Sequence, residues 1–272
     1  MQGEKTRKLY VGTSWKMNKT VNESRQYIST LCDFMNNNPQ VIKNLEVFVL
    51  PAFLAIDSAI QIINKTNSDL KIGAQDCCWE DFGAFTGEVS PMHLKDLGAS
   101  YVELGHAERR NIFMETDEMV SKKLAAVIKN NMKPILCIGE EEKPAQIQTA
   151  LKFLEKQLLE DLSKINKDDL KNIVIAYEPV WAIGATASAP LDYIEEAMDF
   201  LRNLLNKKFG NNCGSDQVII YGGSVTPESA RDILALKNND GIFVGRSALN
   251  VEYFINMIKM ANEVQKSKIT SF

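Results

Sequence analysis

The sequence predicts an α/β fold in which eight parallel strands and their helices form one closed (β/α)8 barrel. Three observations lead to this prediction: eight short apolar runs, helical stretches between most of them, and the lack of a Pro-, Gly- or Ser-rich linker dividing the chain. Such alternation predicts parallel strands with right-handed crossovers, covered by helices. Eight units fit the roughly 250 residues of a single barrel. We therefore expect one domain, 1–272, with the barrel at about 8–265 and short polar tails.

β-branched and aromatic residues mark the candidate strands in order. These are 9–12, 45–50, 70–74, 101–104, 135–138, 173–177, 218–221 and 242–244. Helical periodicity is clear in 119–129 and 191–207, with acidic residues near the start and Lys or Asn near the end. A doubly wound open sheet is the competing architecture. It usually carries a G-x-G-x-x-G turn after its first strand, whereas here residues 13–16 read Thr-Ser-Trp-Lys.

Composition argues against several functional classes. Lys and Arg number 31 against 35 Asp and Glu, which gives a formal net charge of −4 without a basic block for nucleic acid or a membrane surface. No apolar stretch reaches the roughly 18 residues of a membrane span, and the N-terminus lacks the apolar core of a signal peptide. We expect a cytoplasmic protein that binds neither nucleic acid nor membrane.

The cysteines and histidines do not form a metal-binding pattern. Five cysteines are spread along the chain, and the two histidines, His93 and His106, are not at ligand spacings from them. In the reducing cytosol we expect free thiols. The sequence therefore predicts no metal site and no cofactor.

In a parallel barrel the active site lies where strands end, so the residues after each run are the candidates. They are Ser14 and Lys16 after the first run, His106 and Glu108 after the fourth, Glu178 after the sixth, Gly222, Gly223 and Ser224 after the seventh, and Gly245 and Arg246 after the eighth. Glu178 is the first candidate for chemistry. A carboxylate at the end of a buried strand adds little stability, because an unpaired buried charge costs several kcal/mol.

These residue types suit one reaction class. A carboxylate, an imidazole and a lysine at one mouth can abstract a carbon-bound proton beside a carbonyl and stabilise the resulting enediolate, with Glu178 as the base. The two glycine-containing turns can direct backbone N–H groups at an anion, and the last loops of a barrel recurrently bind phosphate. We expect a small phosphorylated sugar as substrate.

Five segments carry a resemblance to a known family: WKMN, GAFTGE, ELGHAERR, AYEPVWAIG and YGGSV. They follow the family's order over nearly the whole chain and resemble the signature segments of triosephosphate isomerase. The resemblance implies a TIM barrel that interconverts dihydroxyacetone phosphate and glyceraldehyde 3-phosphate through an enediolate.

The resemblance also implies roles for individual residues, as already described for that family. Glu178 corresponds to the base and His106 to a neutral electrophile at the substrate oxygens. Lys16 corresponds to the cation near the substrate, and Glu108 to a carboxylate near that lysine. Residues 179–189 resemble a mobile lid that excludes water and protects the enediol phosphate. Phosphate-contacting positions fall on Gly184, Ser224 and Gly245.

Four features depart from the family pattern. Ser14 stands where Asn is usual, and Arg246 replaces a glycine, its guanidinium facing either phosphate or solvent. Ala107 replaces a serine that holds the resting glutamate, and the lid stretch 184–189 lacks the usual second glycine and lysine. Ser14 and Arg246 are also features shared with isomerases of four-carbon ketose phosphates such as erythrulose phosphate, which is the alternative substrate class. A barrel without catalysis that serves as a binding protein is the further alternative.

A long loop at 75–88 predicts a partner. It carries Trp79, Phe82 and Phe85, and an apolar protrusion more often inserts into a neighbour than remains in water. The resemblance implies a two-fold homodimer in which this loop docks on the other subunit, with Cys77, Phe85 and Thr86 at the interface. The Cys77-Cys78 doublet makes the interface thiol-sensitive or is simply two buried structural thiols.

Overall fold

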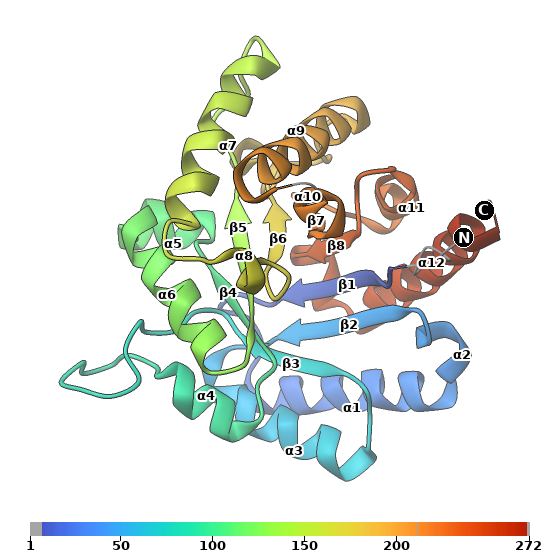
Figure 1. Cartoon of the computed structure of the whole chain (residues 1–272). Helices are drawn as coiled ribbons and strands as arrows, with labels where there is room; N and C mark the ends of the chain where they lie inside the picture. Colours follow the sequence, from blue (N-terminus) through green and yellow to red (C-terminus); the bar gives the residue numbers. More distant parts are fainter. Residues whose placement is uncertain (1–6, 211, 271–272) are drawn as a thin grey trace.

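The computed structural model describes residues 7–210 and 212–270, in which eight parallel strands close into a barrel (Figure 1). The strands are β1 (Leu9–Ser14), β2 (Leu45–Leu50), β3 (Lys71–Ala74), β4 (Tyr101–Leu104), β5 (Lys133–Ile138), β6 (Val174–Tyr177), β7 (Val218–Gly222) and β8 (Gly241–Val244). Each pairs with its neighbours in chain order, and β8 returns to pair with β1, where Ile242 lies opposite Val11. The predicted closed barrel is confirmed, and the open sheet is excluded.

Helices surround the strands (Figure 1). They are α1 (Val21–Asn37), α2 (Pro39–Ile42), α3 (Ile56–Thr66), α4 (Pro91–Leu97), α5 (Ala107–Phe113), α6 (Asp117–Lys129), α7 (Ile147–Asp161), α8 (Lys167–Leu170), α9 (Leu191–Phe209), α10 (Cys213–Asp216), α11 (Pro227–Ala235) and α12 (Val251–Thr270), with 3-10 turns η1 (Phe53–Ala55), η2 (Val180–Ala182) and η3 (Arg246–Leu249). Local chemistry sets their starts: Thr20 caps α1 in a capping box with Glu23. No helix in the described ranges is both long and apolar enough to cross a membrane.

Alternating side chains divide the core into two layers. On β4, Val102 and Leu104 pack outward against the helices, while Tyr101 points into the barrel. Inside, Phe48 stacks on Tyr101 with ring centroids 5.0 Å apart and lies 5.8 Å from the ring of Phe243. Gly12 leaves room for these rings, because a Cβ on it would lie 1.8 Å from Phe48. We call Phe48, Tyr101 and Phe243 the aromatic layer; it fills the middle of the barrel.

The first strand is longer than predicted. Thr13 and Ser14 continue the pairing with Val49 and Leu50, so β1 ends at Ser14 and not at residue 12. The two hydroxyl residues resembled the start of a turn, yet their backbone groups extend the ladder. Ser14 is therefore a strand residue, and its side chain points into the barrel two positions beyond Gly12.

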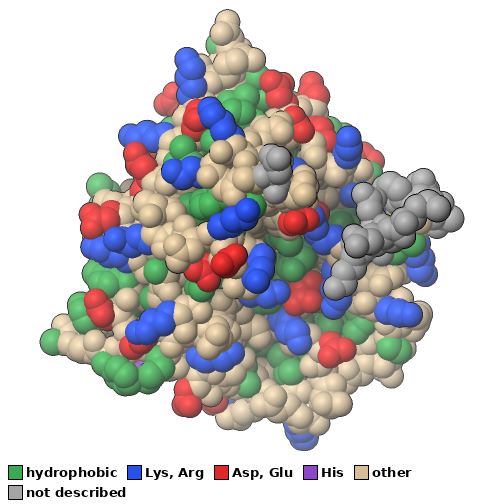
Figure 2. Space-filling view, in the orientation of Figure 1, with side chains coloured by type: hydrophobic (Ala, Val, Ile, Leu, Met, Phe, Trp, Pro, Cys, Tyr) green, Lys and Arg blue, Asp and Glu red, His purple; other side chains and the backbone are tan. Residues whose placement is uncertain are grey.

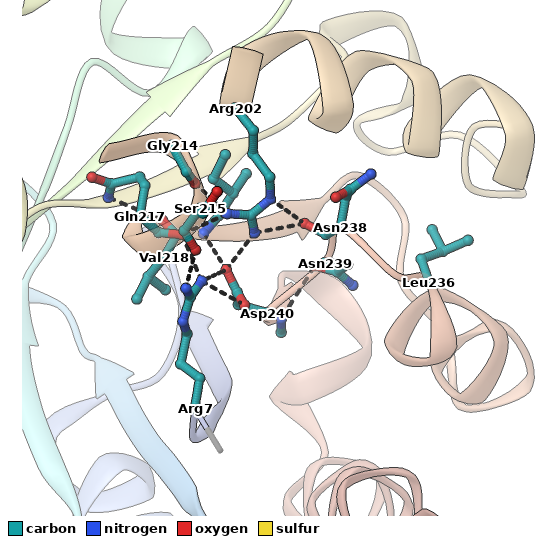
Figure 3. Close-up of polar contacts among 12 residues, drawn as sticks. Arg7, Arg202, Gly214, Ser215, Gln217, Val218, Leu236, Asn238, Asn239 and Asp240 are labelled. Atoms are coloured by element: carbon teal, nitrogen blue, oxygen red, sulfur yellow. Dashed lines mark hydrogen bonds and ion pairs between the residues drawn. The ribbon is translucent and has the colours of Figure 1, made fainter. Parts of the chain in front are cut away.

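The end of the barrel where the strands begin is held by a network around Asp240, just before β8 (Figure 3). Arg7, just before β1, donates to both carboxylate oxygens of Asp240 at 3.0 Å. Arg202, on α9, donates to Asp240 Oδ2 at 2.7 Å, and the N–H of Ile219 on β7 reaches the same oxygen at 2.9 Å. One carboxylate thus joins β1, β7, β8 and a covering helix.

Candidate active site

A cavity of about 660 Å³ opens at the ends of the strands. It is lined by most of the predicted site residues, namely Ser14, Lys16, Glu108, Glu178, Gly184, Gly223, Ser224, Gly245 and Arg246. His106, which follows β4, lies beside it with Nε2 3.9 Å from Glu178 Oε2. The structure therefore brings together the candidates selected from the strand ends.

Glu178 follows β6 and is 8% exposed. Its backbone N–H donates to the carbonyl of Ile138 at 2.8 Å, which continues the β5–β6 ladder and directs the side chain inward. Burial raises the pKa of Glu178 to about 7. The hydrogen bond from the Cys137 thiol and the charge of Lys16 act in the opposite direction and lower it. Around neutral pH the group therefore exchanges a proton readily.

Space is left beside this carboxylate. Among the described residues, Glu178 Oε1 is buried without a hydrogen-bond partner. A void of about 20 Å³ lies next to it, lined by Ala107, Cys137 and Glu178 among others. Ala107, whose methyl group offers no hydrogen-bond donor, shares this void with Glu178.

His106 is held as a neutral imidazole with a defined tautomer. It is the N-cap of α5, and its Nδ1 accepts the backbone N–H of Glu108 at 3.0 Å. Because Nδ1 is an acceptor, Nε2 carries the hydrogen and points toward Glu178. Burial and the nearby Lys16 lower the pKa of His106 to about 4, although Glu108 opposes them. The imidazole is therefore a donor without a charge.

Lys16 is fixed in place by strain and by an ion pair. Its φ of 54° lies in the left-handed region, which is uncommon for residues other than glycine. Its ammonium lies 2.5 Å from Glu108 Oε1, and its carbonyl accepts from Gln75 at 2.9 Å. Glu108 thus holds both the lysine, through its carboxylate, and the imidazole, through its N–H.

The opposite wall of the cavity is built from loops that suit an anion. Gly223 and Ser224 both have positive φ, 123° and 51°, and a Cβ on Gly245 would meet nothing within 4 Å. The guanidinium of Arg246 lies near Gly184 of the lid stretch, 3.4 Å from where a Cβ would be. Within the described ranges Arg246 makes no ion pair, so its charge is available to the cavity.

The lid segment is anchored at both ends. Glu140, 3% exposed, accepts from Trp181 Nε1 at 2.8 Å and from the hydroxyl of Tyr193 on α9 at 2.7 Å. At the far end the N–H of Ala189 donates to the hydroxyl of Tyr221 at 3.0 Å. The sequence interpretation missed Glu140, because nothing in its neighbourhood distinguishes it from an acidic loop residue.

Two further interior groups were also missed. Glu103, on β4, is 3% exposed; its Oε2 is hydrogen-bonded to Ser14 Oγ at 2.7 Å, and Cys137 Sγ is 3.9 Å from its Oε1. Donor atoms of Glu103, Cys137 and Glu178 lie within 4.8 Å of one another, the single group in the described part of the chain able to hold a metal ion. An ion there would occupy Glu178. The sequence feature that could have identified Glu103 is its position two residues after Tyr101, which places both side chains on the same face of the strand.

The predicted interface residues lie away from the cavity. Cys77 is 1% exposed, Phe85 is 41% exposed and Thr86 is exposed. Their loop, between β3 and α4, projects from the barrel (Figure 1), and hydrophobic side chains gather at it in the space-filling view (Figure 2). Phe82, 68% exposed, adds to that surface.

Comparison with known proteins agrees with the geometry. A family model described as triosephosphate isomerase matches residues 9–261. The chain is 40% identical over 253 residues to a protein of Finegoldia magna named triosephosphate isomerase, covering 93% of this chain and 98% of that relative. Proteins of the same name from Fusobacterium nucleatum and Carboxydothermus hydrogenoformans are 38% identical over 256 residues and 39% over 255. These matches cover 94% and 93% of this chain, and 100% and 98% of the relatives.

Proposed function

Because the chain belongs to the triosephosphate isomerase family, we propose that it interconverts dihydroxyacetone phosphate and glyceraldehyde 3-phosphate through an enediolate. One observation carries this proposal. The buried carboxylate of Glu178 and the neutral imidazole of His106 lie 3.9 Å apart beside one cavity. A base and an uncharged hydrogen-bond donor this close together can act on the same substrate, the base on a carbon-bound proton and the donor on the neighbouring carbonyl oxygen.

In the proposed mechanism Glu178 removes a proton from the carbon beside the carbonyl and returns it to the neighbouring carbon. Its raised pKa makes it a stronger base than an ordinary glutamate while leaving it ionised above about pH 7. His106 donates through Nε2–H to the substrate oxygen on which negative charge develops. Lys16 supplies positive charge to the same region, held by Glu108.

The substrate's phosphate is proposed to lie against the opposite wall. The turn at Gly223 and Ser224, together with Gly184 and Gly245, supplies backbone N–H groups, and Arg246 supplies a charge. Closure of the lid, 179–189, excludes water and keeps the enediol phosphate from losing phosphate. Its anchors at Glu140 and Tyr221 support this part of the proposal.

The function is tested by isomerase assays on a panel of three- and four-carbon phosphorylated aldoses and ketoses. We expect the triose phosphates to be preferred, and Glu178→Gln to lower kcat by roughly 100- to 10,000-fold because the general base is lost. Preference for four-carbon ketose phosphates would replace the proposed substrate while keeping the mechanism. No turnover of any sugar phosphate would favour the inactive barrel.

We further propose that the working unit is a two-fold homodimer of single-domain chains in the cytoplasm. The exposed rings of Phe82 and Phe85 on the projecting loop support the dimer. The described cysteines are all free thiols, which suits a reducing compartment. Light scattering tests the assembly: a mass near that of one 30.5 kDa chain would rule out the dimer. Fractionation of cells of the source organism tests the compartment, and enrichment outside the cytosolic fraction would rule it out.

A further inference from the structure

Glu103 is a buried carboxyl group that the mechanism above does not use. It lies on β4 inside the barrel, and its hydrogen-bond partners are the Ser14 hydroxyl at 2.7 Å and, at 3.9 Å, the Cys137 thiol. No described cation forms an ion pair with it. Ser14 in turn lines the cavity that receives the substrate. Glu103 is thus connected to the cavity through a single hydroxyl group.

The charges around Glu103 disfavour its ionised form. Glu178, directly after β6, faces it together with Cys137 on β5, and the charges of Lys16 and Glu108 also act on it. Burial and the charge of Glu178 raise the pKa of Glu103 to about 8, and the charge of Glu108 raises it further. The hydrogen bond with Ser14 and the charge of Lys16 lower it. Two carboxyl groups within 4.8 Å with no cation between them do not both ionise easily, so the charge of Glu178 favours the neutral form of Glu103.

The protonation state of Glu103 determines what Ser14 offers to a ligand. A hydroxyl group has one hydrogen to donate and two lone pairs to accept with. If Glu103 is ionised, it takes the hydrogen of Ser14 and leaves only lone pairs facing the cavity. If Glu103 is neutral, it donates to Ser14 Oγ, and the hydrogen of Ser14 is free to point into the cavity.

We propose that Glu103 is a positioning residue that stays neutral in the working enzyme, donates its proton to Ser14 Oγ and so turns the Ser14 hydroxyl toward the oxygen atoms of the substrate. This inference rests on the proposed isomerase function. It extends that function by making Ser14 a donor to the sugar and by leaving Glu178 as the ionised member of the pair. Substrate binding then weakens when Glu103 loses its proton.

Four variants test this, with KM and kcat measured across about pH 6 to about 9.5. Glu103→Gln keeps the shape and an N–H donor to Ser14 but cannot ionise, whereas Glu103→Leu removes the donor. Ser14→Ala removes the hydroxyl itself. Glu46→Gln is the matched control, since Glu46 accepts from Tyr101 at 2.9 Å on the far side of the aromatic layer.

In the wild type and in Glu46→Gln we expect KM to rise above about pH 8, and in Glu103→Gln we expect it to stay level. At neutral pH, Glu103→Gln should keep KM within about twofold, while Glu103→Leu raises it about tenfold with kcat less affected. Adding Ser14→Ala to Glu103→Leu should change KM little further, because both act through one hydroxyl. An alkaline rise in KM that persists in Glu103→Gln would overturn the inference, as would additive effects of the two substitutions.

Infrared spectroscopy tests the proton without turnover. Because Glu178 also carries a proton in part near pH 7, the carbonyl stretch of neutral carboxylic acids should be stronger in the wild type and in Glu46→Gln than in Glu103→Gln, and the part that Glu103 adds should disappear above about pH 8. Spectra of wild type and Glu103→Gln that do not differ would overturn the inference even if the isomerase assay succeeds. Failure of the isomerase panel with this band present would instead count against the proposed function.

Discussion

Glu178 and His106 share one buried environment, and burial moves their pKa values in opposite directions, to about 7 and about 4. Low dielectric surroundings disfavour the charged form of each group, which is the anion for glutamate and the cation for histidine. Across the range in which Glu178 changes charge, His106 therefore stays neutral. Acid and base roles follow from location as much as from residue type.

The first prediction concerns the acid side of the pH profile. Because only ionised Glu178 can accept a proton, kcat/KM should rise with pH through an apparent pKa near 7, with a single proton involved, before the decline above about pH 8 that is expected from Glu103. Initial rates measured at low substrate from about pH 5 to about 8 check this. A midpoint near the 4.5 of an ordinary glutamate would contradict the burial argument.

Ala107→Ser is the second prediction. A hydroxyl at this position can extend into the void of about 20 Å³ and donate to the unpartnered Oε1 of Glu178. Stabilising the carboxylate lowers its pKa, so the acid limb of kcat/KM should move down by up to about one pH unit. Ala107→Cys is the control of similar shape with a weaker donor, and an equal displacement in both variants would point to filled space instead.

At the scale of the element, the proposed lid, residues 179–189, is anchored near both ends. Trp181 near one end shares Glu140 with Tyr193 of α9, and Ala189 at the other end is tied to Tyr221 of β7. Both anchoring side chains lie outside this segment, Glu140 in the loop after β5 and Tyr221 on β7. Between them the carbonyl of Ala185 accepts from the Ser224 hydroxyl at 2.9 Å, so this stretch also contacts the opposite wall of the cavity.

The third prediction is that Trp181→Phe weakens lid closure. The ring is kept but the hydrogen bond to Glu140 is lost, a bond to a charged group worth about 2 kcal/mol. With the lid less often closed, kcat should fall several-fold, and more inorganic phosphate should be released per turnover as the enediol phosphate decomposes. Tyr193→Phe is the control, because it removes a bond to Glu140 that comes from outside the lid and leaves that of Tyr177 in place. Phosphate release at the wild-type level in Trp181→Phe would argue against Glu140 as an anchor.

The elements also show how far the sequence could predict the molecule. Strand positions were largely correct because apolar β-branched runs are buried on both faces in a parallel barrel. Cavity residues were found because they follow those runs. Glu103 was not among the candidates, because those were the residues that follow strands and Glu103 lies within one. Its partner Ser14 was expected in a turn, whereas it is the last residue of β1. The side-chain contact between Glu103 on β4 and Ser14 on β1 crosses the barrel interior and depends on closure of the barrel, which no local sequence pattern contains.

For the whole molecule, the two ends of the barrel have different tasks. The cavity and its charged groups lie where the strands end, whereas the Asp240 network lies where they begin (Figure 3). The aromatic layer separates them. Substitutions where the strands begin should therefore change the stability of the fold, and substitutions where they end should change the catalytic activity.

The fourth prediction follows for Asp240→Asn. Two arginines, Arg7 and Arg202, lose the charge that they share, so the free energy of unfolding should fall by about 3 kcal/mol. Activity well below the melting temperature should be unchanged. Urea unfolding monitored by circular dichroism measures the loss, with Asp216→Asn, an exposed aspartate at the same end, as the control. Equal effects of the two substitutions would show that the network adds nothing to stability.

The aromatic layer has one more consequence, which concerns isotopes. Because Phe48, Tyr101 and Phe243 close the barrel beneath the site, a hydrogen taken up by Glu178 can reach solvent only through the mouth of the cavity. A heavy isotope transferred from the substrate carbon is therefore held for as long as the lid is shut. The fraction of label that reappears in the product then measures how often the lid opens between the two proton transfers.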